Sequence, residues 1–222
     1  MVPMFTKELI SKIQESPVIA VLVIDEVENA VPLARALLRG GIKAIELTLR
    51  TPIALEALDR VRSEVPEILA GIGTILTPEQ VRAVKERGAA FGVSPGLNSA
   101  VVMAAKELAL PFAPGIMTPS EIETAYGLGC TIMKMFPFEL LGGMEYLKSV
   151  NAPYAHLGIK YIPLGGVSLE NLESYLECPD VLAVGGSWLA PRKLIQEKAW
   201  DKISKNCEEA SEIVIKCRRS HE

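Results

Sequence analysis

Short runs of β-branched and other apolar residues alternate with longer amphipathic segments along the whole chain. The longer segments carry apolar residues three and four positions apart, as at Val27, Ala30, Val31 and Ala34, which is the spacing of one helix face. This alternation is typical of βα units built on a parallel sheet. Eight strands are expected, at Val18–Ile24, Ala44–Leu49, Leu69–Gly73, Ala90–Pro95, Pro111–Ile116, Thr131–Pro137, Lys160–Gly166 and Val181–Leu189.

Local signals indicate where several helices begin and end. Thr77 and Thr118 are each followed by a proline, with glutamine or glutamate three positions on, a pattern typical of an N-cap with proline in the first turn. Gly88 and Gly129 stand where a helix would end before the next strand. The last helix is expected from about Arg192 to Lys216.

Eight βα units within 222 residues match the count and length of a compact (β/α)8 barrel, the TIM barrel. We expect one such domain over residues 1–222, because no linker or low-complexity tract divides the chain. An open doubly wound sheet is the alternative α/β fold. It is disfavoured because Gly71-Ile72-Gly73 continues without the third glycine of a dinucleotide-binding turn.

Composition and charge narrow the class of partner. Hydrophobic residues make up 49% of the chain and charged residues 23%, as in ordinary globular proteins. The net charge of −4 supplies no basic field for nucleic acid, whereas a phosphorylated small molecule fits, because backbone amides alone can hold a phosphate. Four cysteines without C-x-x-C spacing, and no leader or membrane-length apolar run, predict a cytoplasmic protein with reduced thiols and no membrane partner.

The second expected strand places polar groups inside the barrel. Glu46, Thr48 and Arg50 share one face of this strand, and the apolar residues between them share the other. Charged groups inside a barrel are costly unless they are paired or bind a ligand. A structural ion-pair network is the alternative interpretation, but Arg50 stands at the strand's C-terminal end, where barrels of this class carry their chemistry.

The sixth expected strand carries a lysine in an apolar run. Lys134 lies between Met133 and Met135 and shares its face with Ile132 and Phe136, so we expect it to point into the chamber that holds the glutamate. Desolvation and a nearby arginine both favour the neutral amine, which is the nucleophilic form. The alternative is a lysine that extends to the barrel rim.

Two glycine pairs, Gly165-Gly166 and Gly185-Gly186, follow the seventh and eighth expected strands, where such barrels commonly hold a phosphate. His156 and His221 are the only histidines, and neither lies at the C-terminal end of an expected strand. A histidine-based triad or zinc site therefore lacks its key residue. We expect no metal site.

Motifs at the strand ends resemble those of one enzyme family in the same order, and the resemblance covers nearly the whole chain. The family is that of the 2-keto-3-deoxy-6-phosphogluconate (KDPG) and 4-hydroxy-2-oxoglutarate (KHG) aldolases. The segments that carry it are Glu46-Leu47-Thr48-Leu49-Arg50-Thr51, Gly71-Ile72-Gly73-Thr74, Ser94-Pro95-Gly96-Leu97, Pro114-Gly115-Ile116, Lys134-Met135-Phe136-Pro137, Gly165-Gly166-Val167 and Gly185-Gly186-Ser187-Trp188-Leu189.

The resemblance implies a class I aldolase that cleaves KDPG to pyruvate and glyceraldehyde 3-phosphate, or KHG to pyruvate and glyoxylate, with no metal or other cofactor. It implies that Lys134 forms the Schiff base, that Glu46 is the general acid/base and that the enzyme is a homotrimer. It further implies pyruvate-site residues at Arg50, Thr74, Pro95 and Phe136, and phosphate-binding residues at Gly165, Gly166, Gly186 and Ser187.

Two positions depart from the family's usual pattern. Leu164 stands where a threonine usually precedes the glycine pair, and Phe138 stands where a small residue usually follows Phe-Pro. These departures leave an aldolase for the C4 epimer, 2-keto-3-deoxy-6-phosphogalactonate, as an alternative. Two further alternatives are a phosphate-binding barrel enzyme that forms no imine and a non-catalytic phosphometabolite-binding barrel. The last is disfavoured because Lys134 and Glu46 are both present.

Overall fold

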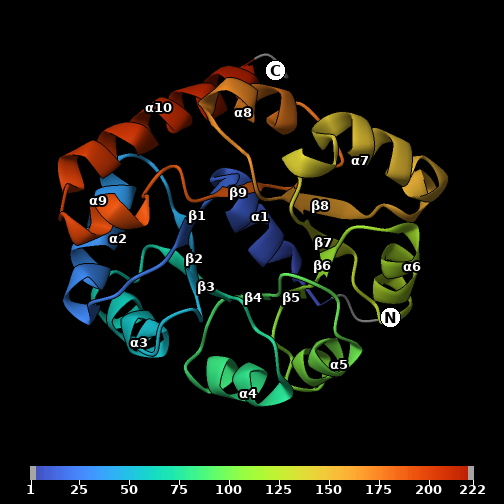
Figure 1. Ribbon diagram of the computed structural model, residues 1–222, viewed down its shortest axis with the longest axis horizontal. Coiled ribbons are helices and arrows are strands. Elements are labelled where there is room, and N and C mark those ends of the chain that lie inside the picture. The colour runs from blue at the N-terminus through green and yellow to red at the C-terminus, as the bar shows by residue number, and fades with distance from the viewer. Residues whose placement is uncertain (1–3, 220–222) are drawn as a thin grey trace.

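Helices surround a curved parallel sheet in the computed structural model, which describes residues 4–219 (Figure 1). His221 lies outside the described residues. The strands are β1 (Val18–Leu22), β2 (Ala44–Thr48), β3 (Leu69–Gly73), β4 (Gly92–Val93), β5 (Phe112–Ala113), β6 (Gly115–Ile116), β7 (Ile132–Met135), β8 (Lys160–Pro163) and β9 (Val184–Gly186).

Most connections between consecutive strands contain a helix, as the sequence predicts. The α-helices are α1 (Lys7–Glu15), α2 (Ala30–Arg39), α3 (Ala54–Glu64), α4 (Pro78–Glu86), α5 (Ser99–Glu107), α6 (Pro119–Gly127), α7 (Gly143–Asn151), α8 (Leu169–Leu176), α9 (Arg192–Gln196) and α10 (Trp200–Arg219). Three 3-10 helices complete the described elements, η1 (Val27–Asn29), η2 (Glu139–Leu141) and η3 (Ala152–Leu157).

The sheet has two hydrogen-bonded parts. Six strands follow the order β5-β4-β3-β2-β1-β9 and three follow the order β6-β7-β8, with parallel pairing throughout. Isolated parallel bridges join Tyr161 to Val181 and Leu164 to Gly185, so the end of β8 lies beside β9. On the other side, only Pro114 separates β5 from β6.

The prediction of one continuous strand at Pro111–Ile116 is therefore wrong, because the structure has two short strands there, β5 and β6. Pro114 has no N–H to donate to a ladder, although its carbonyl accepts a 2.9 Å hydrogen bond from the N–H of Lys134. The next residue, Gly115, lies so close to the Pro95 carbonyl that an added Cβ would come within 2.2 Å of its oxygen. The chain changes partner here, because β5 pairs with β4 whereas Gly115–Ile116 pairs with β7.

Two apolar clusters lie on opposite faces of the strands. The outer cluster packs the strands against the helices and includes Ile45, Leu47 and Met133. The inner cluster includes Ile132 and Leu164 together with apolar side chains of α1. Figure 1 shows α1 across the middle of the ring of strands. Sequence reasoning did not predict this helix, which covers one end of the inner face.

Several predicted helix ends are confirmed, and one helix is corrected. Thr77 and Thr118 each form a capping box at the start of α4 and α6, and Gly88 and Gly129 adopt positive φ after α4 and α6. The expected helix from Arg192 to Lys216 is instead α9 and α10, because Lys198 lies between them in the left-handed region at φ 54°. No helix within residues 4–219 is both long and apolar enough to cross a membrane.

Candidate active site

A cavity of about 460 Å³ lies at the C-terminal ends of the strands and contains most of the predicted site residues. The lysine and the glutamate project from the strands themselves, and the other residues come from the last positions of strands or from the segments that follow them. The predicted residues that line it are Glu46, Arg50, Thr74, Pro95, Lys134, Phe136, Gly165, Gly186 and Ser187. Residues far apart in the sequence thus share one chamber.

Lys134 and Glu46 form the centre of the cavity. The Lys134 Nζ donates to the Glu46 Oε1 at 3.3 Å, although 88 positions separate the two residues. Lys134 is 6% exposed and Glu46 is 3% exposed, so this contact is shielded from bulk water and is stronger than the same contact at the surface. An amine and a carboxylate therefore lie side by side in the cavity, away from bulk water.

The strand alternation that predicted this pair is confirmed. Ile45 and Leu47 belong to the outer cluster, whereas Glu46, Thr48 and Arg50 line the cavity. The same rule holds for β7, where both methionines are buried on the outer face and Lys134 faces inward. The Lys134 Nζ also lies 5.6 Å from the centroid of the next inward-facing ring, that of Phe136, within the range of a cation–π contact.

Arg50 and Thr74 add polar groups at the mouth of the cavity. Arg50 lies just beyond the end of β2 and is exposed to solvent, so its guanidinium is free to form a bidentate contact with a carboxylate. Thr74 directly follows β3 and has a φ of 60°, a conformation that is unfavourable for a β-branched residue and that is often found at functional sites.

The first glycine pair fits the predicted anion-binding loop. Gly165 and Gly166 both have a φ of 90°, which side chains rarely tolerate. Within the described chain, the N–H groups of Gly166 and Val167 donate no hydrogen bond, so they are available to an anion. Gly166 itself does not line the cavity. A Cβ added at Gly166 would meet the side chain of Glu139 instead.

The two departures from the family pattern lie in different places. Leu164 lines the cavity and approaches Gly185, where an added Cβ would lie 2.7 Å from the leucine Cγ. Phe138 is fully buried in the outer cluster, with its ring edge-on to Tyr175 at a centroid distance of 5.2 Å. Of these two residues, only Leu164 contacts the space where a substrate would lie.

Sequence reasoning missed Val21 and Val23 as lining residues. Val21 is the register partner of Glu46, so both valines follow the same inward alternation as the glutamate. The alternation of side chains in the first expected strand places these two valines on the same face. The sequence alone does not show which face is inward, because both faces of that strand are apolar.

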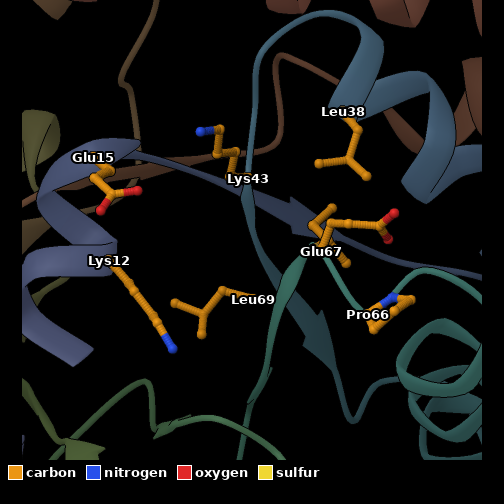
Figure 2. A pocket seen from close by; sticks show the side chains of 8 residues that line it. Lys12, Glu15, Leu38, Lys43, Pro66, Glu67 and Leu69 are labelled. Atoms are coloured by element: carbon orange, nitrogen blue, oxygen red, sulfur yellow. The ribbon is translucent and has the colours of Figure 1, made fainter. Parts of the chain in front are cut away.

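A second hollow of about 370 Å³ lies near the opposite ends of β2 and β3, where Figure 2 shows its lining side chains. Its charged residues Lys12, Glu15, Lys43 and Glu67 are all exposed, and Lys12 pairs with Glu8 at 2.7 Å. In Figure 2 the amine of Lys12 and the carboxylate of Glu67 point in different directions. This hollow lacks a desolvated nucleophile with a partner.

Other reactive groups lie away from the cavity. His156 is exposed within η3. Burial raises the pKa of the Cys130 thiol to about 11 and that of the Cys207 thiol to about 12, so neither is a reactive thiolate near neutral pH. Among residues 4–219, no group of three or more His, Cys, Asp or Glu side chains is arranged to hold a metal ion.

Comparisons with known proteins agree with this arrangement. The family model for KDPG and KHG aldolase matches residues 9–206. The chain is 38% identical over 209 residues to a 2-dehydro-3-deoxy-phosphogluconate aldolase of Haemophilus influenzae, covering 94% of this chain and 98% of the relative. It is 40% identical over 196 residues to the KHG/KDPG aldolase of Escherichia coli K12, covering 88% and 91%.

A solved structure is similar over nearly the same length. The crystal structure of KDPG aldolase from Legionella pneumophila matches with a TM-score of 0.86 and 38% identity, covering 90% of this chain and 97% of that one. In that crystal, pyruvate was captured at low pH as a covalent carbinolamine intermediate. The similarity therefore extends to a protein whose reaction with pyruvate has been observed.

Proposed function

Because the chain belongs to the KDPG and KHG aldolase family, we propose that it is a class I aldolase that cleaves KDPG to pyruvate and glyceraldehyde 3-phosphate. The observation that carries the proposal is the buried amine of Lys134, 3.3 Å from the carboxylate of Glu46. The carbinolamine captured in the Legionella pneumophila relative supports the same chemistry.

The proposed reaction begins when the neutral amine of Lys134 attacks the C2 carbonyl of the substrate. Through Glu46 the carbonyl oxygen gains two protons, one released when the Lys134 ammonium becomes the neutral amine and one from the nitrogen after the attack, and it leaves as water. The third ammonium proton stays on the imine nitrogen. The protonated imine then accepts the electron pair of the C3–C4 bond while Glu46 removes the proton of the C4 hydroxyl. The aldehyde departs and an enamine remains.

The second half regenerates the enzyme. Glu46 donates its proton to C3 of the enamine, and water hydrolyses the resulting imine to pyruvate and the free lysine. The imine nitrogen is the electron sink throughout, so the mechanism uses neither a metal nor an organic cofactor. The same steps convert KHG to pyruvate and glyoxylate.

The remaining predicted residues bind the ends of the substrate. Arg50 holds the carboxylate through its planar fork, which lysine could not reproduce, and Thr74, Pro95 and Phe136 surround the pyruvate portion. The loop amides at Gly165, Gly166, Gly186 and Ser187 hold the phosphate. The partner of this site is therefore a phosphorylated 2-keto acid.

We also infer that the two parts of the sheet form one closed (β/α)8 barrel, as a single domain that spans the chain. The continuity of β5 and β6 across Pro114 and the bridge between Leu164 and Gly185 support closure. The resemblance supports a homotrimer, and the four cysteines without C-x-x-C spacing support a cytoplasmic location.

A related function is favoured by Leu164. An apolar side chain in the cavity wall offers no hydrogen bond to the hydroxyl-bearing carbons of the substrate. The C4-epimeric substrate, 2-keto-3-deoxy-6-phosphogalactonate, is therefore a second candidate for the same imine chemistry. The reaction class is the same in both cases.

Reduction with borohydride in the presence of pyruvate tests the proposal. Intact-mass and peptide mass spectrometry should find a reduced pyruvate adduct on Lys134. The matched control is Lys134→Arg, which keeps a cation beside Glu46 but cannot form the imine, and it should remain unmodified. A folded wild-type protein that forms no adduct in excess pyruvate would refute the aldolase proposal and favour a barrel enzyme that forms no imine.

A further inference from the structure

Gly73, the last residue of β3, leaves open the space that the carboxyl group of Glu46 occupies. A Cβ added at Gly73 would lie 1.8 Å from the Glu46 Oε1, 2.5 Å from its Cδ and 2.7 Å from its Cγ. Atoms that are not bonded to each other do not approach this closely. The end of the glutamate side chain therefore lies directly against the backbone of Gly73, and even one methyl group there would exclude its present position.

The backbone at Gly73 does not itself require glycine. The residue is in an ordinary strand, paired with Thr48, and its carbonyl accepts a 2.9 Å hydrogen bond from the N–H of Leu49. It is absent from the residues with positive φ, in contrast to Gly165 at 90°. The glutamate, rather than the backbone, is what an alanine at this position would disturb.

A neighbouring glycine on the same strand shows the contrast. An added Cβ at Gly71 would meet the buried ring of Phe91 at 2.3 Å, so a substitution there would disturb the inner core. At Gly73 the obstructed atoms are the far end of a flexible side chain that borders a cavity of about 460 Å³. The carboxylate therefore has room to swing away while the fold is kept.

We propose that Gly73 is a positioning residue. Because it has no side chain, it leaves the space in which the carboxylate of Glu46 lies within reach of Lys134. The inference rests on the proposed aldolase function. Proton transfer requires hydrogen-bond distance between the donor and the acceptor, and the Nζ–Oε1 distance of 3.3 Å is already at the long end of that range. A methyl group at Gly73 moves the carboxylate out of this range but leaves the amine in place.

The test compares Gly73→Ala with Gly96→Ala. Gly96 is exposed, and apart from its two chain neighbours no residue has a heavy atom within 4 Å of the Cβ that would be added there, so this control adds the same methyl group without a collision. Three quantities are measured in each protein. They are the borohydride-trapped pyruvate adduct, the exchange of the pyruvate methyl protons with deuterium from D2O, and kcat and KM for KDPG cleavage.

In Gly73→Ala, the adduct on Lys134 should still form, because the lysine and its pocket are unchanged. Methyl proton exchange and kcat should fall by about 10²-fold, the lower end of what general acid–base catalysis contributes, while KM stays close to that of the unsubstituted protein. Gly96→Ala should match the unsubstituted protein in all three measurements.

A double-mutant comparison separates positioning from a general loss of structure. Glu46→Ala removes the three atoms, Cγ, Cδ and Oε1, that a Cβ at Gly73 would meet. Glu46→Ala alone should slow exchange because the proton acceptor is lost. Adding Gly73→Ala in the Glu46→Ala background should then cost less than about threefold, against about 10²-fold in the native background.

Exchange at the unsubstituted rate in Gly73→Ala would overturn the inference. An equal loss of exchange rate in both backgrounds, or failure of Gly73→Ala to fold, would also overturn it, because either of these two outcomes would make Gly73 a packing residue. If instead the unsubstituted protein forms no adduct, the aldolase proposal fails, and the inference fails with it. The trapping measurement therefore distinguishes the two failures.

Discussion

At the scale of single residues, Thr74 is the clearest case of local strain beside the cavity. It is a β-branched residue at a φ of 60°, where an L-residue loses roughly 1–2 kcal/mol relative to ordinary backbone conformations. Glycine has no such penalty, although its freedom in the unfolded chain offsets part of the gain, by about 0.4–1 kcal/mol.

We therefore expect Thr74→Gly to be more stable than Thr74→Ala by about 0.5–1 kcal/mol, since both lose the side chain but only glycine relieves the strain. Both variants should have a raised KM, because both lose the side chain that we propose contacts the pyruvate portion of the substrate. Urea denaturation and steady-state kinetics measure the two effects. Equal stabilities for the two variants would show that the backbone at Thr74 is not strained.

Leu164 carries a prediction about substrate choice. Threonine and valine have nearly the same shape, so Leu164→Thr and Leu164→Val differ mainly by one hydroxyl group. The threonine variant should change the ratio of kcat/KM for KDPG to that for its C4 epimer by roughly 2- to 12-fold, the value of one net hydrogen bond. The valine variant should leave the ratio close to that of the native protein.

Competitive assays with both epimers measure this ratio, and thermal denaturation of both variants controls for the loss of buried leucine volume. The same shift in both variants would indicate that cavity volume, rather than hydrogen bonding, sets the preference.

Phe138 is buried against Tyr175. Phe138→Ala should therefore change the free energy of unfolding by more than the free-energy difference that corresponds to its change in the epimer ratio.

Residue-scale reasoning predicted the direction of side chains better than their distances. The period of two in β2 and β7 was enough to place Glu46 and Lys134 on inward faces. It did not reveal that Gly73 makes room for the glutamate, because that relation is a contact between neighbouring strands. The register of β2 against β3 decides it.

At the scale of elements, one ionic contact links the two ends of the βα series. Arg192, at the start of α9, donates through its Nε to the Asp25 Oδ2 at 2.8 Å, and Gln196 donates to the same oxygen at 2.9 Å. Asp25 follows β1, and α9 follows β9. The contact therefore connects segments next to Val23 and Ser187, which both line the cavity.

The Arg192 guanidinium holds the pKa of Asp25 below its usual range. A carboxylate with a lowered pKa stabilises the fold at every pH above its unfolded value, near 3.9. That contribution is lost as the pH falls through the lower folded value. We therefore expect Asp25→Asn to melt at a lower temperature than the native protein at pH 7, by no more than a few degrees because the pair is partly exposed.

Melting temperatures measured between pH 7 and pH 2 test this expectation. The difference between Asp25→Asn and the native protein should disappear at the acidic end. Arg192→Gln should produce a similar loss, and the double variant should add little to it. A difference that persists unchanged at pH 2 would mean that the carboxylate charge is not responsible.

Element boundaries were the least predictable feature. The capping boxes at Thr77 and Thr118 could be predicted because the residues that make them are close together in the sequence. The break at Lys198 could not, because a lysine carries no intrinsic preference for positive φ. The split at Pro114 had a local signal in the proline, but its effect depends on the close approach of Gly115 to Pro95.

At the scale of the whole molecule, the prediction concerns assembly. The chain mass is 24.0 kDa, so the proposed homotrimer should have a mass of about 72 kDa, three times that value. Light scattering coupled to size-exclusion chromatography, over a range of protein concentrations, measures it. A single 24 kDa species at all concentrations would contradict the trimer and leave the imine chemistry at Lys134 unaffected.

The sequence by itself determined the α/β class, the alternation of strands and helices, and the inward direction of Lys134 and Glu46, because each depends on a period or a cap within one segment. The tertiary structure decided which segments meet. The 3.3 Å contact across 88 positions, the Asp25–Arg192 contact across 167 positions and the space at Gly73 follow from strand register and sheet curvature, which no local pattern encodes.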